Sequence, residues 1–352
     1  MFRPKIQSSG CRRLALAAVP VVALTLGLAA CGGEGSTPAA GTSEGTPKVA
    51  AVIKGLDNPF FQAMEDGVKS TAQAAGVDAT VQAAADIGDT TGQADKLTAL
   101  AGQDFSCYVV NPISGTNLVQ SLAQISAADK TIVNIDQPVD ATAAKAANLK
   151  IVTYIGTDNE AAGGKAGEFV ASTAGAGADV AIVGGISGDV TSAARVDGFK
   201  AATQGQLNVA TEVAADWKRE LALTKATDIL AANKNIKAFF AANDDMGLGI
   251  VKAVENAGLT GQVTVVSVDG NQDALQSVAD GALTATVAQY PYAIGTLGVQ
   301  ACQVAAAGKA LPPNIESPTA LVGKAEAADA LAKFPQPFQQ FDNPLEPLLA
   351  GT

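Results

Sequence analysis

The residues from Lys54 to Phe61 gather a cation, an amide and two aromatic rings in one short segment. The apolar run Val49–Ile53 before them is typical of a buried strand, and Pro59 suits the first turn of a helix. The side chains therefore meet where a strand passes into a helix, the edge at which open α/β sheets bind ligands. The segment predicts a site for a small polyhydroxylated ligand. The alternative is that one or both of Phe60 and Phe61 belong to the hydrophobic core.

Composition and incomplete motifs exclude several other kinds of site. The chain of 352 residues contains no histidine, which excludes His-dependent triads, His-ligated metals and an imidazole base. The segment DGNQD at 269–273 opens like a calcium loop, but Ala274 and Asp280 stand where such a loop needs Gly and Glu. GGK at 163–165 lacks the rest of a phosphate-binding loop, and the glycine loop 184–188 is interpreted as a flexible turn. We expect neither a metal nor a cofactor.

Residues 1–30 have the pattern of a bacterial lipoprotein signal peptide. Basic residues precede the apolar run Leu14–Ala30, and Leu28–Cys31 forms a lipobox. Cleavage before Cys31 would free its thiol for attachment of a diacylglycerol. An uncleaved membrane anchor is the alternative, but the apolar run is short and is interrupted by Pro20. We therefore expect an extracytoplasmic protein, lipid-anchored to the bacterial cell membrane.

The segment that follows the signal predicts a flexible tether over residues 31–47, rich in Gly, Ser, Thr and Pro. Without the signal's four basic residues, the chain has 19 basic and 34 acidic residues and a net charge of −15. So acidic a protein is not expected to bind nucleic acid or to adhere to an anionic membrane by charge. The lipid would provide the attachment.

From residue 48 onward, short apolar runs alternate with longer amphipathic stretches, which predicts parallel sheets with helices on both faces. The runs are too many for one ordinary sheet, and the pattern nearly repeats. Asp136 and Asp269 each end a run, as do Asn111 and Asn243, so two similar lobes across a groove are the economical interpretation. The expected strands are Val49–Ile53, Ala79–Ala83, Cys107–Val110, Ile132–Ile135, Ile151–Ile155, Val180–Val183, Val209–Ala214, Ala238–Ala241, Val263–Val268 and Thr284–Ala288, and the expected helices include Gly92–Ala101, Leu118–Ala128, Glu160–Ser172, Arg219–Ala232, Gly247–Asn256 and Ala293–Ala307.

Two cysteines remain in the body of the chain, Cys107 at the start of an expected strand and Cys302 in a late helix. Outside the cytoplasm they could pair as a disulfide. The alternative, two separate buried thiols, is slightly favoured by the sequence.

Nine short motifs follow one another along residues 48 to about 330. They are NPFF at 58–61, VVNP at 109–112, ID at 135–136, GTDN at 156–159, SAAR at 192–195, ADW at 215–217, AANDDM at 241–246, VDG at 268–270 and ATVAQYP at 285–291. Each motif is weak alone, but in this order they resemble those of periplasmic sugar-binding proteins of the ribose-binding type, which supply ABC importers.

The resemblance implies a type I periplasmic-binding-protein fold, with two Rossmann-like lobes of parallel sheets joined by a three-segment hinge. The crossings are expected near 157–159, 289–291 and 317–322. Lobe one would then comprise 48–157 and 290–317, and lobe two 158–289 and 318–330. Residues 331–352 are expected to be a Pro-rich tail that does not carry the site.

The resemblance also implies which side chains face the groove. Carboxylates, amides and guanidinium groups can bind pairs of sugar hydroxyls, and aromatic rings can cover the apolar faces of the sugar. From the residues alone, Asp136 and Asp269 could instead be turn or helix caps, and Arg195 could lie on a helix surface. Asp244 and Asp245 are expected to cap the next helix. The family's pattern places Asn58, Phe60, Phe61 and Asp136 on the first wall, Arg195, Trp217, Asn243 and Asp269 on the second, and Gln289 at the hinge.

Two positions depart from the ribose-binding pattern. Gln137 follows Asp136 where the ribose binders carry Arg, and Lys54 stands five residues before Pro59, as in arabinose-binding relatives where it contacts the sugar. Both Lys54 and Gln137 are expected to bind the ligand, and Lys54 could alternatively be a solvated charge at the rim. The exchange puts ribose itself in doubt and leaves pentoses, hexoses and polyols open.

The leading hypothesis is a solute-binding lipoprotein of an ABC sugar importer. It would capture a monosaccharide or polyol, with a pentose-like ligand favoured, by hinge closure. It would then deliver the ligand to a membrane permease and its ATPase. We expect a monomer and no enzymatic activity. The alternative is a receptor that presents a sugar or signal molecule to a membrane sensor kinase. A glycosidase using Asp136 and Asp269 as paired carboxylates is a third, less favoured hypothesis, because both already have binding roles.

Overall fold

The structure is a computed structural model and describes residues 47–350. The expected signal peptide, the lipidated Cys31 and nearly all of the expected tether lie outside these residues. In the described part of the chain, no helix is long and apolar enough to cross a membrane.

Strands in the described residues form two six-stranded sheets. The first sheet has the order β11-β5-β4-β3-β1-β2 and is parallel throughout. It consists of β1 (Lys48–Ile53), β2 (Asp78–Ala83), β3 (Cys107–Val110), β4 (Thr131–Ile135), β5 (Ile151–Thr157) and β11 (Asn314–Ser317). The second sheet has the order β12-β10-β9-β8-β6-β7, and only β12 runs antiparallel to its neighbour. It consists of β6 (Asp179–Gly184), β7 (Asn208–Ala214), β8 (Ile236–Ala241), β9 (Thr264–Asp269), β10 (Ala285–Ala288) and β12 (Ala320–Val322).

Each sheet is covered by helices on both faces, and β1 shows how the sequence achieves this. Val49, Ala51 and Ile53 face one hydrophobic core, whereas Ala50 and Val52 face another. Successive side chains of a strand point to opposite faces, so a strand covered on both sides must be apolar at every position. The apolar runs of the sequence, which lack hydrophobic–polar alternation, have this origin.

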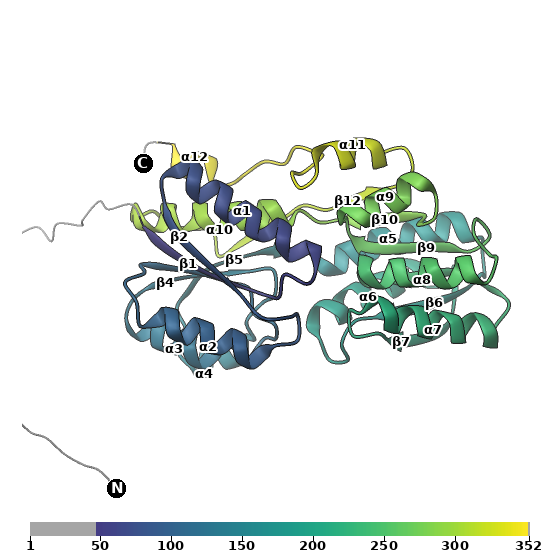
Figure 1. The fold of residues 1–352 in the computed structure, drawn as a ribbon, viewed down its shortest axis with the longest axis horizontal. Coiled ribbons are helices and arrows are strands. Elements are labelled where there is room, and N and C mark those ends of the chain that lie inside the picture. Colours follow the sequence, from purple (N-terminus) through teal and green to yellow (C-terminus); the bar gives the residue numbers. More distant parts are fainter. Residues whose placement is uncertain (1–46, 351–352) are drawn as a thin grey trace, which may run out of the picture. The chain divides into compact units, whose positions relative to one another are not determined.

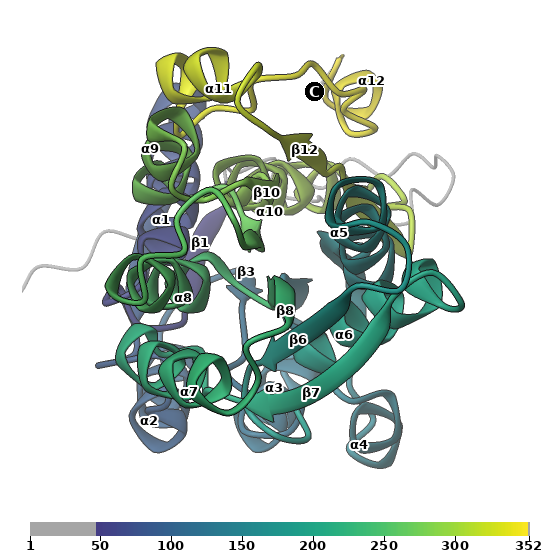
Figure 2. The ribbon, with the colours of Figure 1, turned by 90° about the vertical axis from the view of Figure 1, so that its right-hand side faces the viewer.

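Helices α1 (Pro59–Ala75) and α10 (Pro291–Ala306) pack together on one face of the first sheet, and α2 (Thr90–Ala101) and α3 (Val119–Ala127) lie on the other. On the second sheet, α7 (Arg219–Ala232), α8 (Asp244–Asn256) and α9 (Gln272–Asp280) cover one face, and α5 (Asn159–Ala174) and α6 (Val190–Thr203) cover the other. Figures 1 and 2 show this layering. Three short helices complete the described part: α4 (Ala141–Ala146), α11 (Ala327–Lys333) and α12 (Glu346–Leu349).

The chain passes between the two sheets between β5 and α5, between β10 and α10, and between β11 and β12. Strands β11 and β12 were not predicted. They have four and three residues and lie at the sheet edges, and β11 carries the polar residues Asn314 and Glu316. Short edge strands of this kind lack the continuous apolar run that marks a strand buried on both faces.

The C-terminal segment returns across the region between the sheets, as the yellow ribbon in Figure 1 shows. Helix α11 packs on α9 beside the second sheet, and Leu345 is fully buried in the core beside the first sheet. Between them, Phe338 and Phe341 pack against a small cluster that includes Tyr290 at the second crossing. The tail therefore makes a fourth crossing, which the composition of the segment did not reveal.

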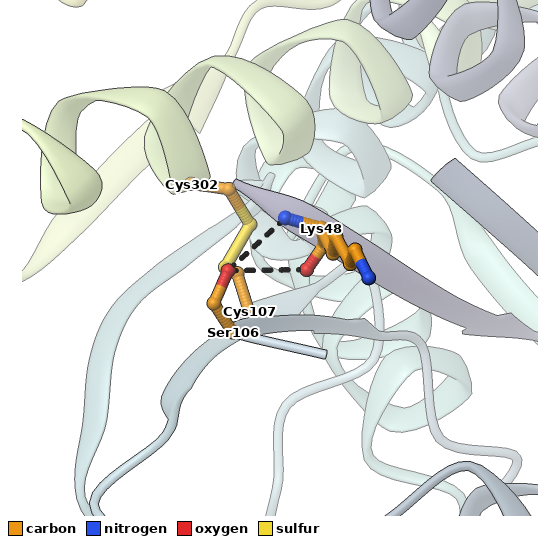
Figure 3. Close-up of a disulfide and its surroundings, with 4 residues drawn as sticks. All are labelled: Lys48, Ser106, Cys107 and Cys302. Atoms are coloured by element: carbon orange, nitrogen blue, oxygen red, sulfur yellow. Dashed lines mark hydrogen bonds between the residues drawn. A yellow bond between two sulfur atoms is a disulfide. The ribbon is translucent and has the colours of Figure 1, made fainter. Parts of the chain in front are cut away.

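Cys107 and Cys302 form a disulfide, so the slightly favoured expectation of two separate thiols is wrong (Figure 3). Cys107 begins β3 and Cys302 lies in α10, 195 residues later, and their Cα atoms are 5.8 Å apart. The pairing is decided by the packing of α10 against β3, a contact between segments that lie far apart in the sequence. Beside it, the Ser106 hydroxyl bonds the backbone N–H and C=O of Lys48 (Figure 3).

Candidate binding site

A cavity of about 560 Å³, including its open mouth, lies where strands of both sheets reach their carboxyl ends. In parallel α/β sheets this edge presents loop side chains and helix N-termini to a ligand. Ten of the eleven predicted ligand-binding residues line the cavity, namely Lys54, Asn58, Phe60, Phe61, Asp136, Gln137, Arg195, Trp217, Asn243 and Asp269. Gln289 is not among the lining residues.

On the wall from the first sheet, a cation and a carboxylate lie side by side. Lys54 follows β1 and Asp136 follows β4, and Lys54 Nζ lies 3.6 Å from Asp136 Oδ2. The side chains are 14% and 13% exposed, so Lys54 is not the solvated rim charge of the alternative interpretation. Its ammonium also lies 5.3 Å from the centroid of the Phe61 ring. The sequence shows only that each of these groups follows a strand. They come together because β1, β3 and β4 are neighbours in the sheet.

The adjacent rings of Phe60 and Phe61 contribute both to the hydrophobic core and to the cavity wall. Phe60 and Phe61 are 4% and 8% exposed and belong to a hydrophobic core of the first sheet, yet both line the cavity. Their ring planes meet at 79° with centroids 5.2 Å apart, an edge-to-face arrangement. Asn58 fixes their position, because its Oδ1 accepts a hydrogen bond from the Phe60 N–H at 2.9 Å and so caps α1.

On the wall from the second sheet, Arg195 is a buried cation held on several sides. Its Nε donates to Asn159 Oδ1 at 2.8 Å, and its Nη1 donates to the backbone oxygen of Ala242 at 2.7 Å and to Asp269 Oδ1 at 3.1 Å. The residue is 4% exposed, so it is not a surface helix residue. The guanidinium carbon lies 5.8 Å from the Trp217 ring centroid. A fixed guanidinium fork of this kind can bind two hydroxyls.

Asp269 ends β9 in a backbone conformation with φ of 140°, and Gly270 follows with φ of 78°. The Gln289 side chain lies behind it and donates from Nε2 to Asp269 Oδ1 at 2.8 Å. Gln289 thus positions the carboxylate, and its own Oε1 is buried without a hydrogen-bond partner among residues 47–350. Burial raises the pKa of Asp269 to about 6, against the opposing effect of Arg195.

The expectation that Asp244 caps α8 is wrong, because Asn243 takes that role. Asn243 Oδ1 accepts from the Met246 N–H at 2.9 Å while the residue lines the cavity. Asp244 is fully buried and accepts hydrogen bonds from Ser267 Oγ, Thr286 Oγ1 and the Asn271 N–H at 2.5, 2.7 and 2.7 Å. Burial, with the neighbouring Asp269 carboxylate, raises the pKa of Asp244 to about 8.

Asp245, the other residue expected to cap this helix, lies in the first turn of α8. Its carboxylate pairs with Arg219, with Nη2 at 2.6 Å from Oδ1. It lies outside the cavity.

Sequence reasoning missed five lining residues, Ile87, Ile113, Ile186, Asp189 and Thr191. Ile186 belongs to the glycine loop 184–188, which was interpreted as no more than a turn, and Asp189 and Thr191 follow it directly. Asp189 caps α6 by accepting from the Ser192 N–H at 2.8 Å. A glycine loop after a strand, followed by a helix cap, was the available signal. Ile87 and Ile113 gave no such signal, because nothing in their sequence neighbourhood marks them as cavity residues.

In the described residues, no three acidic or cysteine side chains converge as a metal site would require. The cavity instead offers carboxylates, amides, a guanidinium, an ammonium and three aromatic rings. Such a set suits a neutral ligand with several hydroxyl groups, which both donate and accept hydrogen bonds.

Comparisons with known proteins agree with this chemistry. The family model described as "Periplasmic binding protein domain" matches residues 49–310. The D-allose-binding periplasmic protein of Escherichia coli is 38% identical over 256 residues, covering 71% of this chain and 82% of that protein. The ribose import binding protein of Bacillus subtilis is 31% identical, covering 76% and 85%.

Solved structures are similar over most of the described chain. A periplasmic solute-binding protein of an ABC transporter from Actinobacillus succinogenes, with bound D-allose, has a TM-score of 0.76 at 29% identity and covers 80% of this chain and 99% of that one. A solute-binding protein from Mycobacterium smegmatis with bound glycerol has a TM-score of 0.73 at 30% identity and covers 81% and 96%. The expected fold class is thereby confirmed, and the chain belongs to the periplasmic binding protein domain family, as a sugar-binding protein of the ribose type.

Proposed function

We propose that this protein is the solute-binding component of an ABC sugar importer and captures a monosaccharide or polyol between its two lobes. The observation that carries the proposal is one cavity whose two walls come from different sheets, each with a cation beside a carboxylate, fully buried on the second wall and largely buried on the first. The relatives named for D-allose and ribose support the ligand class.

Binding would proceed by closure of the lobes about their crossings, with no bond made or broken. Lys54 and Asp136 would meet the ligand from the first wall, and Arg195, Asn243 and Asp269 from the second. Phe60, Phe61 and Trp217 would cover its C–H faces. Closure buries these polar groups, so each hydrogen bond that a wrong sugar fails to make costs about 1–3 kcal/mol. That penalty is the source of specificity.

A glycosidase mechanism is less well supported. Asp136 and Asp269 are each paired with a cation on their own wall. Both carboxylates are therefore already engaged in binding contacts, whereas a glycosidase needs a pair that is free to act as acid and nucleophile or base. The relatives that match are named as binding proteins.

We further propose that the protein is a monomer and that a lipid on Cys31 holds it at the outer face of the cell membrane. There it would deliver the ligand to a permease and its ATPase. The signal and lipobox pattern of residues 1–31 supports the anchor. Metabolic labelling with a radioactive fatty acid tests it, with Cys31→Ser expected to abolish incorporation.

Calorimetric titration of the purified protein with a panel of pentoses, hexoses and polyols tests the binding function. D-allose and D-ribose head the panel because of the relatives. We expect at least one sugar or polyol to bind with a stoichiometry of about one, the number of cavities with this lining. A panel in which nothing binds would contradict the proposal.

Asp136→Ala should weaken binding at least about tenfold, because Lys54 loses its partner and the ligand loses a bidentate acceptor. The matched control is Asp66→Ala, which removes an exposed carboxylate on α1 and should leave affinity unchanged. Equal affinities in the two variants would remove Asp136 from the site.

A further inference from the structure

One hydrogen bond joins the two walls of the cavity directly. Thr191 Oγ1, on α6 beside the second sheet, donates to Gln137 Oε1, which follows β4 of the first sheet, at 2.8 Å. Gln137 is 2% exposed, and both residues line the cavity. Every other hydrogen bond given above for the cavity side chains stays within one wall.

Both partners stand on well-fixed backbone. The Gln137 N–H bonds Asn111 Oδ1 at 3.4 Å, and its carbonyl oxygen accepts from Asn134 Nδ2 at 2.8 Å. Thr191 lies in the first turn of α6, which the Asp189 cap anchors. The hydrogen bond between Thr191 and Gln137 therefore depends on the relative position of the two walls, because neither backbone is free to shift toward the other.

The chemistry of an amide gives this contact a second consequence. A glutamine side chain has one acceptor oxygen and an NH₂ with two donors. The oxygen of Gln137 is taken by Thr191, whereas Nε2 makes no hydrogen bond to any residue in 47–350. An arginine at this position would have no acceptor for the threonine proton. Gln137 can therefore bind the opposite wall with one end of its amide and a sugar hydroxyl with the other.

Resting on the proposed function, we infer that Thr191 is a positioning residue that acts through Gln137. When the lobes close, its hydroxyl fixes the amide so that Nε2 faces the ligand. Ligand contact by Gln137 and closure of the lobes then become one event, and the bond slows reopening of the closed cavity.

A double-mutant cycle with Thr191→Val and Gln137→Met tests this inference. Thr191→Val keeps the shape of the side chain and removes the donor, and Gln137→Met keeps the length and removes the amide. We expect Thr191→Val to weaken the affinity for the best sugar of the panel by roughly three- to tenfold, the effect of one buried hydrogen bond. In the Gln137→Met background the same substitution should have almost no effect.

The loss should appear mainly in the dissociation rate, because the bond forms only after the walls meet. Stopped-flow fluorescence of Trp217, the single tryptophan and a lining residue, measures that rate. Thr191→Ser, which retains the hydroxyl, should retain coupling to Gln137. The control Thr227→Val makes the same change on the exposed face of α7 and should leave the rate unchanged.

If Thr191→Val weakens binding equally in both backgrounds, Thr191 contacts the sugar itself and the positioning role is overturned. A wild-type protein that binds nothing in the panel contradicts the proposed function, and the inference that rests on that function is overturned with it.

Discussion

Arg195 and Asp269 form an ion pair in the interior, with Nη1 and Oδ1 3.1 Å apart and side chains only 5% and 6% exposed. Asp269 follows an apolar run and Arg195 ends the motif SAAR, and the resemblance to ribose-type binding proteins implies that both face the ligand. The structure shows that they hold each other in place. The ligand site and the stability of the second lobe are therefore linked at this pair.

Asp269→Ala should both weaken sugar binding at least about tenfold and lower the free energy of unfolding by about 3–5 kcal/mol, because a buried cation loses its counter-charge. Urea denaturation and calorimetric titration measure the two effects. The double variant Arg195→Met with Asp269→Leu should unfold at a higher urea concentration than Asp269→Ala. The opposite order would show that the unpaired charge of Arg195 is not what destabilises Asp269→Ala.

Stability should fall as the pH rises from about 5 to about 8. Burial raises the pKa of Asp244 to about 8 and that of Asp269 to about 6, both above the ordinary value of 3.8 for an aspartate. In this window the native protein holds protons that the unfolded chain has released, so raising the pH favours unfolding. Urea unfolding at several pH values should show this slope, and Asp244→Asn should flatten it. The exposed control Asp66→Asn should preserve the slope; a slope that survives Asp244→Asn would exclude Asp244 as its source.

Gly185→Ala should displace the Trp217 ring, which lines the cavity. A Cβ on Gly185 would lie 2.2 Å from the Trp217 ring, a distance that forces the ring to move. We expect a changed tryptophan emission spectrum and weaker sugar binding. Gly102→Ala is the matched control, because the atom nearest to its added Cβ lies 3.9 Å away and its φ of −81° suits alanine. An unchanged spectrum in Gly185→Ala would show that the ring is not packed on this glycine.

The Cys107–Cys302 disulfide should stabilise the fold without shaping the site. It closes a loop of 195 residues, and loss of a disulfide of this kind costs about 2–5 kcal/mol. Cys107 is the first residue of β3, whereas the cavity lies at the carboxyl ends of the strands. The paired variant Cys107→Ser with Cys302→Ser should therefore melt at a lower temperature but bind sugar with little change. A large loss of affinity would mean that the bridge reaches the cavity.

Leu345→Ala should destabilise the protein although the residue lies in the Pro-rich tail. Leu345 is fully buried in the core beside the first sheet, and removing a buried leucine costs about 2–5 kcal/mol. The control is Leu348→Ala, which truncates a partly buried residue of the same tail. It should lower the free energy of unfolding, measured by urea denaturation, by less than Leu345→Ala does. Equal, small losses would mean that the tail does not dock.

The chain's own order of residues determined the fold class and most of the site. Apolar runs without alternation mark strands buried on both faces, and the side chain that follows each run must reach the carboxyl edge of its sheet. For that reason the sequence places Lys54, Asp136, Asn243 and Asp269 at sheet edges, and the resemblance to ribose-type binding proteins implies that they face the ligand. Such patterns are local, so they can be recognised without knowing how the segments pack.

Tertiary structure decided what depends on segments far apart in the sequence. The pairing of Cys107 with Cys302, the burial of Leu345 and the place of Gln289 behind Asp269 each need a contact that no local pattern encodes. The hydrogen bond from Thr191 to Gln137 also depends on how the two sheets are placed, because it forms only where they approach each other. A sequence pattern specifies which side chains reach an edge, and only packing specifies what they meet there.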